Sequence, residues 1–306
     1  MQSNSPGKSN SLEKSNSLRI GLLGHGAIGS AVAAGLEAGK VEGAELVAVL
    51  DPWAPHLSLG VGSLEELLAV SNVVVEAAGH DALREYGSKV REAGLDLLVV
   101  SVGALADEGL YQDLLSAGSK NPGSKNPGSK STEHKVGKLY VTTGAIGGLD
   151  TIGAAALAGA ITRVEITSRK PAANLLQPWM DESLQDELLA GDTHTAVRDE
   201  TREIIAFSGP AREACRLFPQ SANVCATLSL ATVGFDETHV TMVGDPARKL
   251  VRHEIRVEAE SGVYEFAFEN ITSPSNPKTS AIVPYAVLRG LGFLAKGVSR
   301  GGLLLV

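Results

Sequence analysis

Short apolar runs alternate with amphipathic segments over the first half of the chain. The apolar runs predict strands at 18–23, 45–50, 72–77, 95–101 and 138–142, and helices are predicted at 28–36, 63–68, 81–93 and 107–116. The run at 72–77 is rich in valine, which is typical of a strand buried on both faces. Regular strand–helix alternation indicates βαβ units, so we expect a parallel sheet with right-handed crossovers.

Beyond about residue 150 the pattern changes. A helix at 151–160 is followed by strand-like runs at 163–168, 203–207, 239–243, 254–260 and 263–269, without regular helices between them. Ser261 and Gly262 separate the last two runs and predict a hairpin turn. This part of the chain therefore predicts a mixed or antiparallel sheet with a few helices. A final helix at 281–294 is expected to pack on the first part.

The expected fold class is α/β, with a doubly wound (Rossmann) parallel sheet and a second α+β domain built on a mixed sheet. We assign 18–144 together with 280–306 to the first domain and 145–279 to the second. Residues 1–17 form a polar tail, and 118–130 repeat the segment Gly-Ser-Lys-Asn-Pro. Neither has enough apolar residues to offset the entropy of ordering, so a disordered tail and a disordered inserted loop are expected.

Composition narrows the class of protein. The 306 residues are 43% hydrophobic and 20% charged, as in ordinary globular proteins, and their number suits two domains. A net charge of −8 argues against nucleic acid and anionic membranes as partners, since both attract a basic surface. Two cysteines are too few for a disulfide framework, and no apolar run reaches the ~20 residues that span a bilayer. A cytoplasmic location is expected.

The strongest local signal is the motif Gly24-His25-Gly26-Ala27-Ile28-Gly29, between a predicted strand and a predicted helix. In this setting Gly24 permits a tight turn, Gly26 lets the backbone approach a pyrophosphate, and Gly29 permits close helix–strand packing. Free amides at the start of the helix then face the phosphates. The motif predicts a dinucleotide site.

Asp51 ends the second predicted strand, where a carboxylate accepts hydrogen bonds from the adenosine ribose and repels a 2′-phosphate. NAD is therefore the expected cofactor, although one residue leaves NADP open. A second glycine cluster, 144–148, follows the fifth strand. It is interpreted either as part of the ligand site or as an ordinary tight turn.

Several blocks of sequence resemble the L-aspartate dehydrogenase family. They are Val74–Ala78, Ser101–Asp107, Gly144–Asp150, Ser221–Leu228, Gly244–Pro246 and Asn276–Ser280. The blocks run in the family's order from about residue 18 to about residue 290, and leave unmatched the tail and the inserted repeats.

The resemblance implies NAD(P)-dependent oxidation of L-aspartate to iminoaspartate, which feeds quinolinate and NAD synthesis or hydrolyses to oxaloacetate and ammonia. It places the catalytic histidine at His253 and further cofactor contacts at Ala145 and Asn223. It also implies a homodimer paired through the second domain, as in related dehydrogenases. One departure is that Val251 stands where the family usually has asparagine. Arg252 is expected to lower the pKa of His253 if it faces the same pocket.

Two substrate carboxylates require cations and hydrogen-bond donors. Lys278, Thr279 and Ser280 are the candidates, placed at the start of the last predicted helix, where backbone amides attract anions. The alternative is an ordinary helix cap beside a solvated lysine. Arg169 and Lys170 are further candidates for the same role. No metal ion is expected, because the nicotinamide ring accepts the hydride and no residue cluster has metal-ligand spacing.

Two alternatives stay open. One is an oxidoreductase of the same architecture that acts on another amino acid or on a semialdehyde. The other is a non-catalytic sensor that binds NAD(H) without turnover. The predicted histidine and the Asn276–Ser280 block argue against a sensor, whereas Val251 is the residue that favours it.

Overall fold

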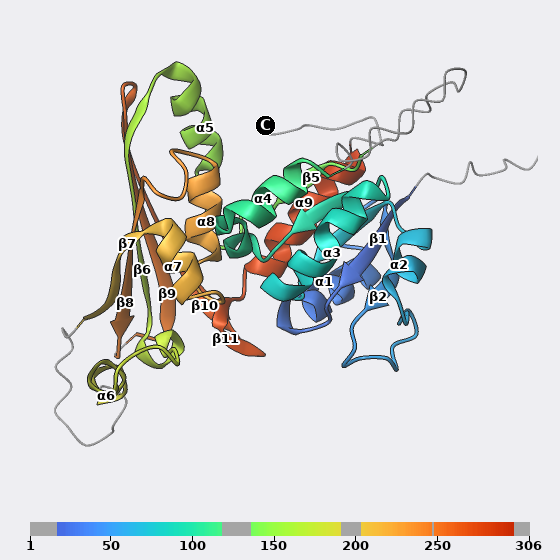
Figure 1. Cartoon of the computed structure of the whole chain (residues 1–306), viewed down its shortest axis with the longest axis horizontal. Coiled ribbons are helices and arrows are strands. Elements are labelled where there is room, and N and C mark those ends of the chain that lie inside the picture. The colour runs from blue at the N-terminus through green and yellow to red at the C-terminus, as the bar shows by residue number, and fades with distance from the viewer. Residues whose placement is uncertain (1–16, 118–135, 191–202, 247, 297–306) are drawn as a thin grey trace, which may run out of the picture.

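The structure is a computed structural model that describes residues 17–117, 136–190, 203–246 and 248–296. The predicted tail, apart from Ser17, the repeats at 118–130 and the end of the chain at 297–306 lie outside the described residues. Figure 1 shows two sheets side by side, with helices α7 (Ala211–Leu217) and α8 (Asn223–Leu230) between them.

The first sheet is parallel and five-stranded, in the order β2-β1-β3-β4-β5. Its strands are β1 (Leu18–Leu23), β2 (Ala44–Leu50), β3 (Val73–Glu76), β4 (Asp96–Val99) and β5 (Leu139–Val141). Within β3, Val73 and Val75 pack into one apolar core and Val74 packs into another. The prediction of a parallel sheet buried on both faces is thereby confirmed.

Helices cover both faces of this sheet. On one side lie α1 (Ala27–Glu37) and α9 (Val283–Lys296), and on the other α2 (Leu64–Val70), α3 (His80–Glu92) and α4 (Glu108–Leu115). Helices α1 and α9 approach closely, because a Cβ atom at Gly35 would lie 2.4 Å from Leu288 Cδ1. Helix α9, the last that the structure describes, thus packs on helix α1 of the first domain.

The second sheet is mixed and six-stranded, in the order β11-β10-β9-β6-β8-β7. Its strands are β6 (Ile161–Pro171), β7 (Ile204–Pro210), β8 (Thr238–Asp245), β9 (Leu250–Ala259), β10 (Gly262–Ser273) and β11 (Asn276–Ser280). Strand β6 runs parallel to β8, and the other neighbours are antiparallel, as a mixed sheet requires. The predicted hairpin joins β9 and β10, and Gly262 after its turn has φ +145°.

Further helical segments lie against this sheet or join it to the first. They are α5 (Leu149–Ala158), η1 (Val102–Ala106), η2 (Ala172–Leu175) and α6 (Glu182–Ala190), in addition to α7 and α8. The sequence pattern does not reveal α8, because nearly all its residues are buried and a polar face is missing. It connects the two halves of the molecule: Thr227 Oγ1 donates to the Thr142 carbonyl, which follows β5.

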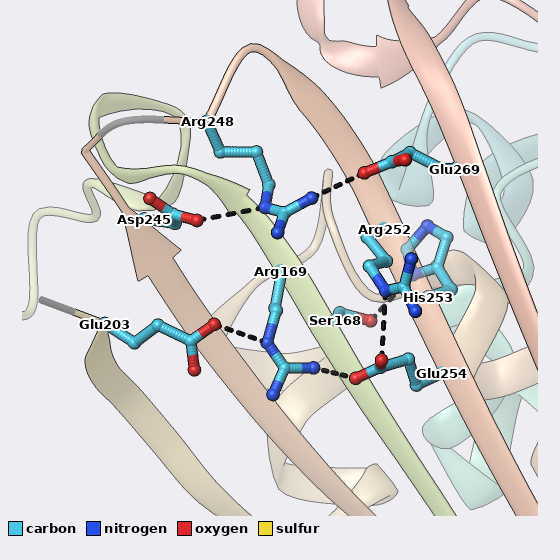
Figure 2. A network of polar contacts seen from close by, with 9 residues as sticks. All are labelled: Ser168, Arg169, Glu203, Asp245, Arg248, Arg252, His253, Glu254 and Glu269. Atoms are coloured by element: carbon cyan, nitrogen blue, oxygen red, sulfur yellow. Dashed lines mark hydrogen bonds and ion pairs between the residues drawn. The ribbon is translucent and has the colours of Figure 1, made fainter. Parts of the chain in front are cut away.

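Residues of β9 alternate between two different environments. Val251, His253 and Ile255 are buried on the inner face of the six-stranded sheet, whereas Arg252 and Glu254 lie on the outer face. Figure 2 shows the outer face, where Arg169 lies between Glu203 and Glu254, and Arg248 between Asp245 and Glu269. Within the described part of the chain, no helix has the length and apolar character to cross a membrane.

Candidate active site

The glycine-rich loop between β1 and α1 has the geometry that a pyrophosphate needs. Gly24 has φ +88°, and a Cβ atom there would lie 2.7 Å from the Ala77 carbonyl oxygen. A Cβ atom at Gly29 would lie 2.0 Å from the carbonyl oxygen of Gly24, so loop and helix require both glycines. Around Gly26, the N-cap of α1, a Cβ atom would meet nothing within 4 Å. The loop is therefore open where a dinucleotide would approach the helix N-terminus.

Asp51 lies directly after β2, next to this loop. Its Oδ2 accepts a hydrogen bond from the His25 backbone N–H at 2.6 Å, and its Oδ1 accepts one from the Trp53 N–H at 2.8 Å. The carboxylate is thus fixed beside the loop, as a ribose-binding acid must be. Trp53 is 91% exposed.

Glu76 is a buried carboxylate within the block Val74–Ala78, and no role was predicted for it from the sequence. Its oxygens accept hydrogen bonds from the N–H groups of Ala78, Gly79 and Ser101 and from the Ser101 hydroxyl, all at 2.9–3.0 Å. Burial raises the pKa of Glu76, and the hydrogen bonds from Ser101 and from the turn oppose this shift. The carboxylate ties the turn that contacts Gly24 to the start of the next loop.

A cavity with about 490 Å³ of empty space, its open mouth included, lies between the two sheets. It brings together most of the predicted catalytic, nicotinamide and substrate residues. Its lining comprises Ile28, Val100, Val102, Thr142, Gly144, Ala145, Lys170, Gln220, Ser221, Asn223, Val224, Thr227, His253, Lys278, Thr279, Ser280 and Val283. Ile28 alone represents the glycine-rich motif here, so the dinucleotide loop and the cavity adjoin through the start of α1.

His253 lies within strand β9, whereas the strand predicted from the sequence began only at residue 254. Strand β9 already begins at Leu250 and is paired on both sides, with Ser168 of β6 and Phe268 of β10 opposite His253. The ring is 2% exposed, and its Nδ1 lies 2.9 Å from Ser168 Oγ. Burial, and then the nearby charge of Lys170, lowers the pKa of His253 to about 3, so the imidazole is neutral at physiological pH.

Arg252 does not face the cavity, so the condition for its predicted effect on His253 is not met. It points to the outer face, where its Nε donates to Glu254 at 2.9 Å, so it is not the charge that lowers the histidine pKa (Figure 2). Val251 is buried on the inner face and lies opposite Asn270 of β10. Asn270 Nδ2 donates to the Ala145 carbonyl oxygen at 3.1 Å, and so places an amide side chain beside the residue that replaces the family's asparagine.

The loop at 144–148 forms one wall of the cavity. Gly144 has φ +64° and Gly148 has φ +73°, and a Cβ atom at Gly148 would lie 2.5 Å from the Phe266 ring. The helix after it begins at Gly148 as N-cap, with Asp150 in the first turn. At the start of helix α8, Asn223 Oδ1 accepts a hydrogen bond from the Gly103 N–H at 2.8 Å. This bond leaves the Asn223 amide nitrogen as a donor.

The segment containing Lys278, Thr279 and Ser280 lines the cavity as expected, but it is the edge strand β11. Helix α9 begins only at Val283, so these residues do not occupy a helix N-terminus. The reason is pairing with β10, where Ser280 lies opposite Thr272. These three residues therefore offer an anion their side chains and not the backbone amides of a helix N-terminus.

Arg169 and Lys170 are adjacent in β6 and point to opposite faces. Arg169 pairs with Glu203 and Glu254 outside, whereas Lys170 is buried and lines the cavity. The structure thus separates two residues that the sequence analysis treated alike. Ser168, the partner of His253, was not predicted, because nothing in the local sequence marks the strand pairing that brings the two together.

Comparisons with known proteins agree with this architecture. Residues 150–292 match the family described as aspartate dehydrogenase, C-terminal, and residues 24–124 match the homoserine dehydrogenase NAD binding domain. L-aspartate dehydrogenase of Methanosarcina barkeri is 34% identical over 93% of this chain and 99% of its own length. L-aspartate dehydrogenase 2 of Bordetella pertussis is 36% identical over 88% of this chain and 94% of its own.

Among solved structures, aspartate dehydrogenase from Thermotoga maritima superposes with a TM-score of 0.67 at 24% identity, covering 94% of this chain and 99% of that one. This structural similarity supports the fold. The sequence identity to the two relatives, over nearly their full length, indicates common ancestry. The chain belongs to the L-aspartate dehydrogenase family.

Proposed function

We propose that this protein oxidises L-aspartate at Cα to iminoaspartate with NAD(P)⁺ as the hydride acceptor. The observation that carries the proposal is the cavity between the sheets, where neutral His253 lies with Lys170 and Lys278. Among the described residues that line it, none is Asp or Glu. Such a cavity attracts an anion and offers it a base, which suits an acidic amino acid.

The residues of the first domain fit a dinucleotide. The roles proposed for them are pyrophosphate binding by Gly24, Gly26, Ala27, Ile28 and Gly29, ribose binding by Asp51, and nicotinamide contacts by Ala145 and Asn223. When bound, the nicotinamide accepts the hydride from Cα. The Asp51 carboxylate disfavours a 2′-phosphate, so NAD is the preferred form. The open surface at Gly26 and the free amide nitrogen of Asn223 support these assignments.

His253 acts as the general base. Oxidation of the ammonium form of aspartate removes one hydride and one proton, and a neutral imidazole accepts that proton. Ser168 holds Nδ1, which leaves Nε2 for the substrate. The low pKa of His253 reflects burial and the Lys170 charge, and a bound dicarboxylate offsets that charge and raises the pKa toward neutrality. The base thus strengthens when the substrate is present.

Lys278, Thr279 and Ser280 are proposed to bind a substrate carboxylate from the edge strand β11. An ammonium group and two hydroxyls supply charge-assisted and neutral hydrogen bonds to carboxylate oxygens. All three line the cavity together with His253, which supports this role.

We further propose a cytoplasmic homodimer in which residues 145–279 carry the substrate site and pair the subunits. The free, buried thiols of Cys215 and Cys225 suit a reducing compartment. The outer face of the six-stranded sheet, with its alternating charges, is the proposed contact. As the family resemblance implies, the product would supply quinolinate and NAD synthesis.

NADH formation with L-aspartate at alkaline pH tests the proposal, with His253→Ala as the variant. Turnover is expected to fall by about 10²–10⁴-fold, the usual worth of a general base, while NAD binding measured by fluorescence stays unchanged. His56→Ala is the matched control, because His56 is exposed in the loop after β2. A native protein that binds NAD but leaves aspartate unoxidised would refute the substrate assignment. Full activity in His253→Ala would refute the base.

A further inference from the structure

Lys170 is a buried ammonium group without a carboxylate partner in the described part of the chain. It is 4% exposed, and its Nζ donates to the carbonyl oxygens of Ser221 at 3.2 Å and Lys278 at 3.4 Å. Two neutral carbonyls do not offset the loss of hydration of a buried charge. An anionic ligand would offset this buried charge, since the residues that the structure describes place no carboxylate on it.

The position of Lys170 follows from strand periodicity. It lies two residues after Ser168 in β6, so both side chains point to the inner face, and Ser168 is the residue bonded to His253. Arg169 between them points to the outer face and is fully engaged with Glu203 and Glu254 (Figure 2). Lys170 therefore faces the same cavity as the proposed base.

The charged side chains among the described residues that line the cavity are Lys170 and Lys278, so its charge is positive. Burial, together with the nearby charge of Lys278, lowers the pKa of Lys170 to about 8, so the group is still mainly an ammonium at neutral pH. The lining holds both lysines, and among its described residues no acid offsets them. Two separate cations in one small cavity match a ligand with two separate carboxylates.

Ser221 provides an independent observation beside Lys170. Its side chain is 4% exposed and lines the cavity, and its Oγ has no hydrogen-bond partner among the described residues. A buried hydroxyl without a partner costs stability, which a ligand with acceptor oxygens would recover. The backbone carbonyl of the same residue already holds Lys170 Nζ, so ammonium and hydroxyl lie together.

We propose that Lys170 and Ser221 form a carboxylate subsite, which binds one end of a dicarboxylate substrate while Lys278 binds the other. The subsite rests on the proposed function and specifies how that function selects an acidic amino acid. The substrate carboxylate serves as the counter-ion of Lys170 and accepts a hydrogen bond from the Ser221 hydroxyl.

The test compares native protein with Lys170→Met and Ser221→Ala, and uses Lys249→Met as the matched control. Lys249 is exposed between β8 and β9, so the control removes the same charge outside the cavity. Two quantities are measured for each: the KM for L-aspartate, and the dissociation constant of succinate by calorimetry. Succinate has both carboxylates and no amine, so its binding does not depend on hydride transfer.

Lys170→Met is expected to raise both constants by about thirtyfold or more, and Ser221→Ala by about three- to tenfold, with Lys249→Met unchanged. Thermal unfolding confirms that each variant is folded, and Lys170→Met is expected to melt no lower than native protein. A lower kcat with unchanged succinate affinity would make Lys170 a proton-transfer group and overturn the subsite. Unchanged constants in both variants would overturn it as well.

The two proposals fail in different ways. If native protein binds succinate and the binding depends on Lys170, but L-aspartate is not oxidised, the subsite stands and the aspartate reaction is wrong. If aspartate is oxidised and Lys170→Met keeps its KM and its succinate affinity, the reaction stands and the subsite is wrong.

Discussion

Lys170 and His253 lie on one face of a sheet, and the charge of Lys170 affects the protonation of His253. The charge of Lys170 adds to burial in lowering the pKa of His253 to about 3, while the pKa of Lys170 itself falls only to about 8. At neutral pH the cavity therefore holds a charged ammonium beside a neutral imidazole. The ammonium is suited to bind an anion, and the imidazole is suited to accept a proton.

The buried ammonium predicts a specific dependence of stability on pH. The folded-state pKa of Lys170 is lowered to about 8 from 10.5, so below pH 8 both folded and unfolded states carry the charge and the folded state bears its full cost. At about 1.4 kcal/mol per pKa unit, the lowering of the Lys170 pKa corresponds to a loss of up to about 3 kcal/mol in the free energy of unfolding. Replacing the lysine with methionine removes this loss. Lys170→Met is therefore expected to be more stable than native protein at pH 7.

As pH rises from 8 to 10.5, Lys170 loses its proton in the folded protein before it does so in the unfolded chain. The difference in the free energy of unfolding between native protein and Lys170→Met therefore shrinks toward zero. Urea unfolding of both proteins without substrate, at pH 7, 9 and 10.5, measures the difference directly. A constant difference across this range would mean that Lys170 is not a destabilised ammonium in the fold. Lys249→Met, which removes an exposed charge, should show little difference at any of these pH values.

At the scale of elements, the loop at 144–148 depends on contacts from both halves of the molecule. Thr142 Oγ1 accepts the Gly144 N–H at 3.2 Å at the end of the first sheet. From the second sheet, Asn270 donates to the Ala145 carbonyl and the Phe266 ring packs against Gly148. The wall proposed to contact the nicotinamide is thus held mainly by β10, more than 100 residues away in sequence.

Asn270→Ala tests this support. Loss of the bond to Ala145 is expected to lower the free energy of unfolding by about 1 kcal/mol and to weaken NAD binding several-fold, because the loop is no longer held. Asn72→Ala is the control, since Asn72 Oδ1 accepts one backbone bond, from the Arg19 N–H at 3.1 Å, far from the loop. Equal losses of NAD affinity in the two variants, measured by titration, would contradict a specific role for Asn270.

The same elements show what the sequence allowed us to predict. The motif at Gly24–Gly29, the acid Asp51 and the valines of β3 have local signatures, because turn geometry and burial on two faces restrict the residue type at each position. The regular alternation of strands and helices in the same region predicts that the first sheet is parallel. Helix α8 has no such signature, since it is buried on nearly all sides and its small apolar residues show no periodic polar face.

Pairing between distant strands accounts for the remaining differences. Ser168 and His253 are 85 residues apart, and the sequence near either one does not specify that they are opposite each other. The depth of His253 in the sheet follows from this pairing. In the same way, pairing with β10 makes Lys278–Ser280 part of a strand, where a helix start was expected. Predicted residues from both domains line one cavity, and the environment of each depends on strand register.

For the whole molecule, the outer face of the six-stranded sheet is a charged surface on the side away from the cavity. Arginines and glutamates of β6, β9 and β10 alternate across it, as in the pairs of Arg256 with Glu258 and Glu265. Val263 and Ile271 of β10 are 54% and 65% exposed on the same face. Apolar side chains among self-complementary charges suit contact with a second copy of the face, because a two-fold axis brings opposite charges together.

Ala267 lies midway along β10 on this face, opposite Glu254 of β9, and provides a test of assembly. Light scattering of native protein is expected to give twice the 31.7 kDa mass of one chain. Ala267→Arg adds bulk and charge that the monomer accommodates beside its glutamates but a packed interface does not, so the mass should fall toward that of one chain. Ala93→Arg, at the exposed C-terminus of α3, should leave the mass unchanged. A dimeric Ala267→Arg would exclude this face as the contact between subunits.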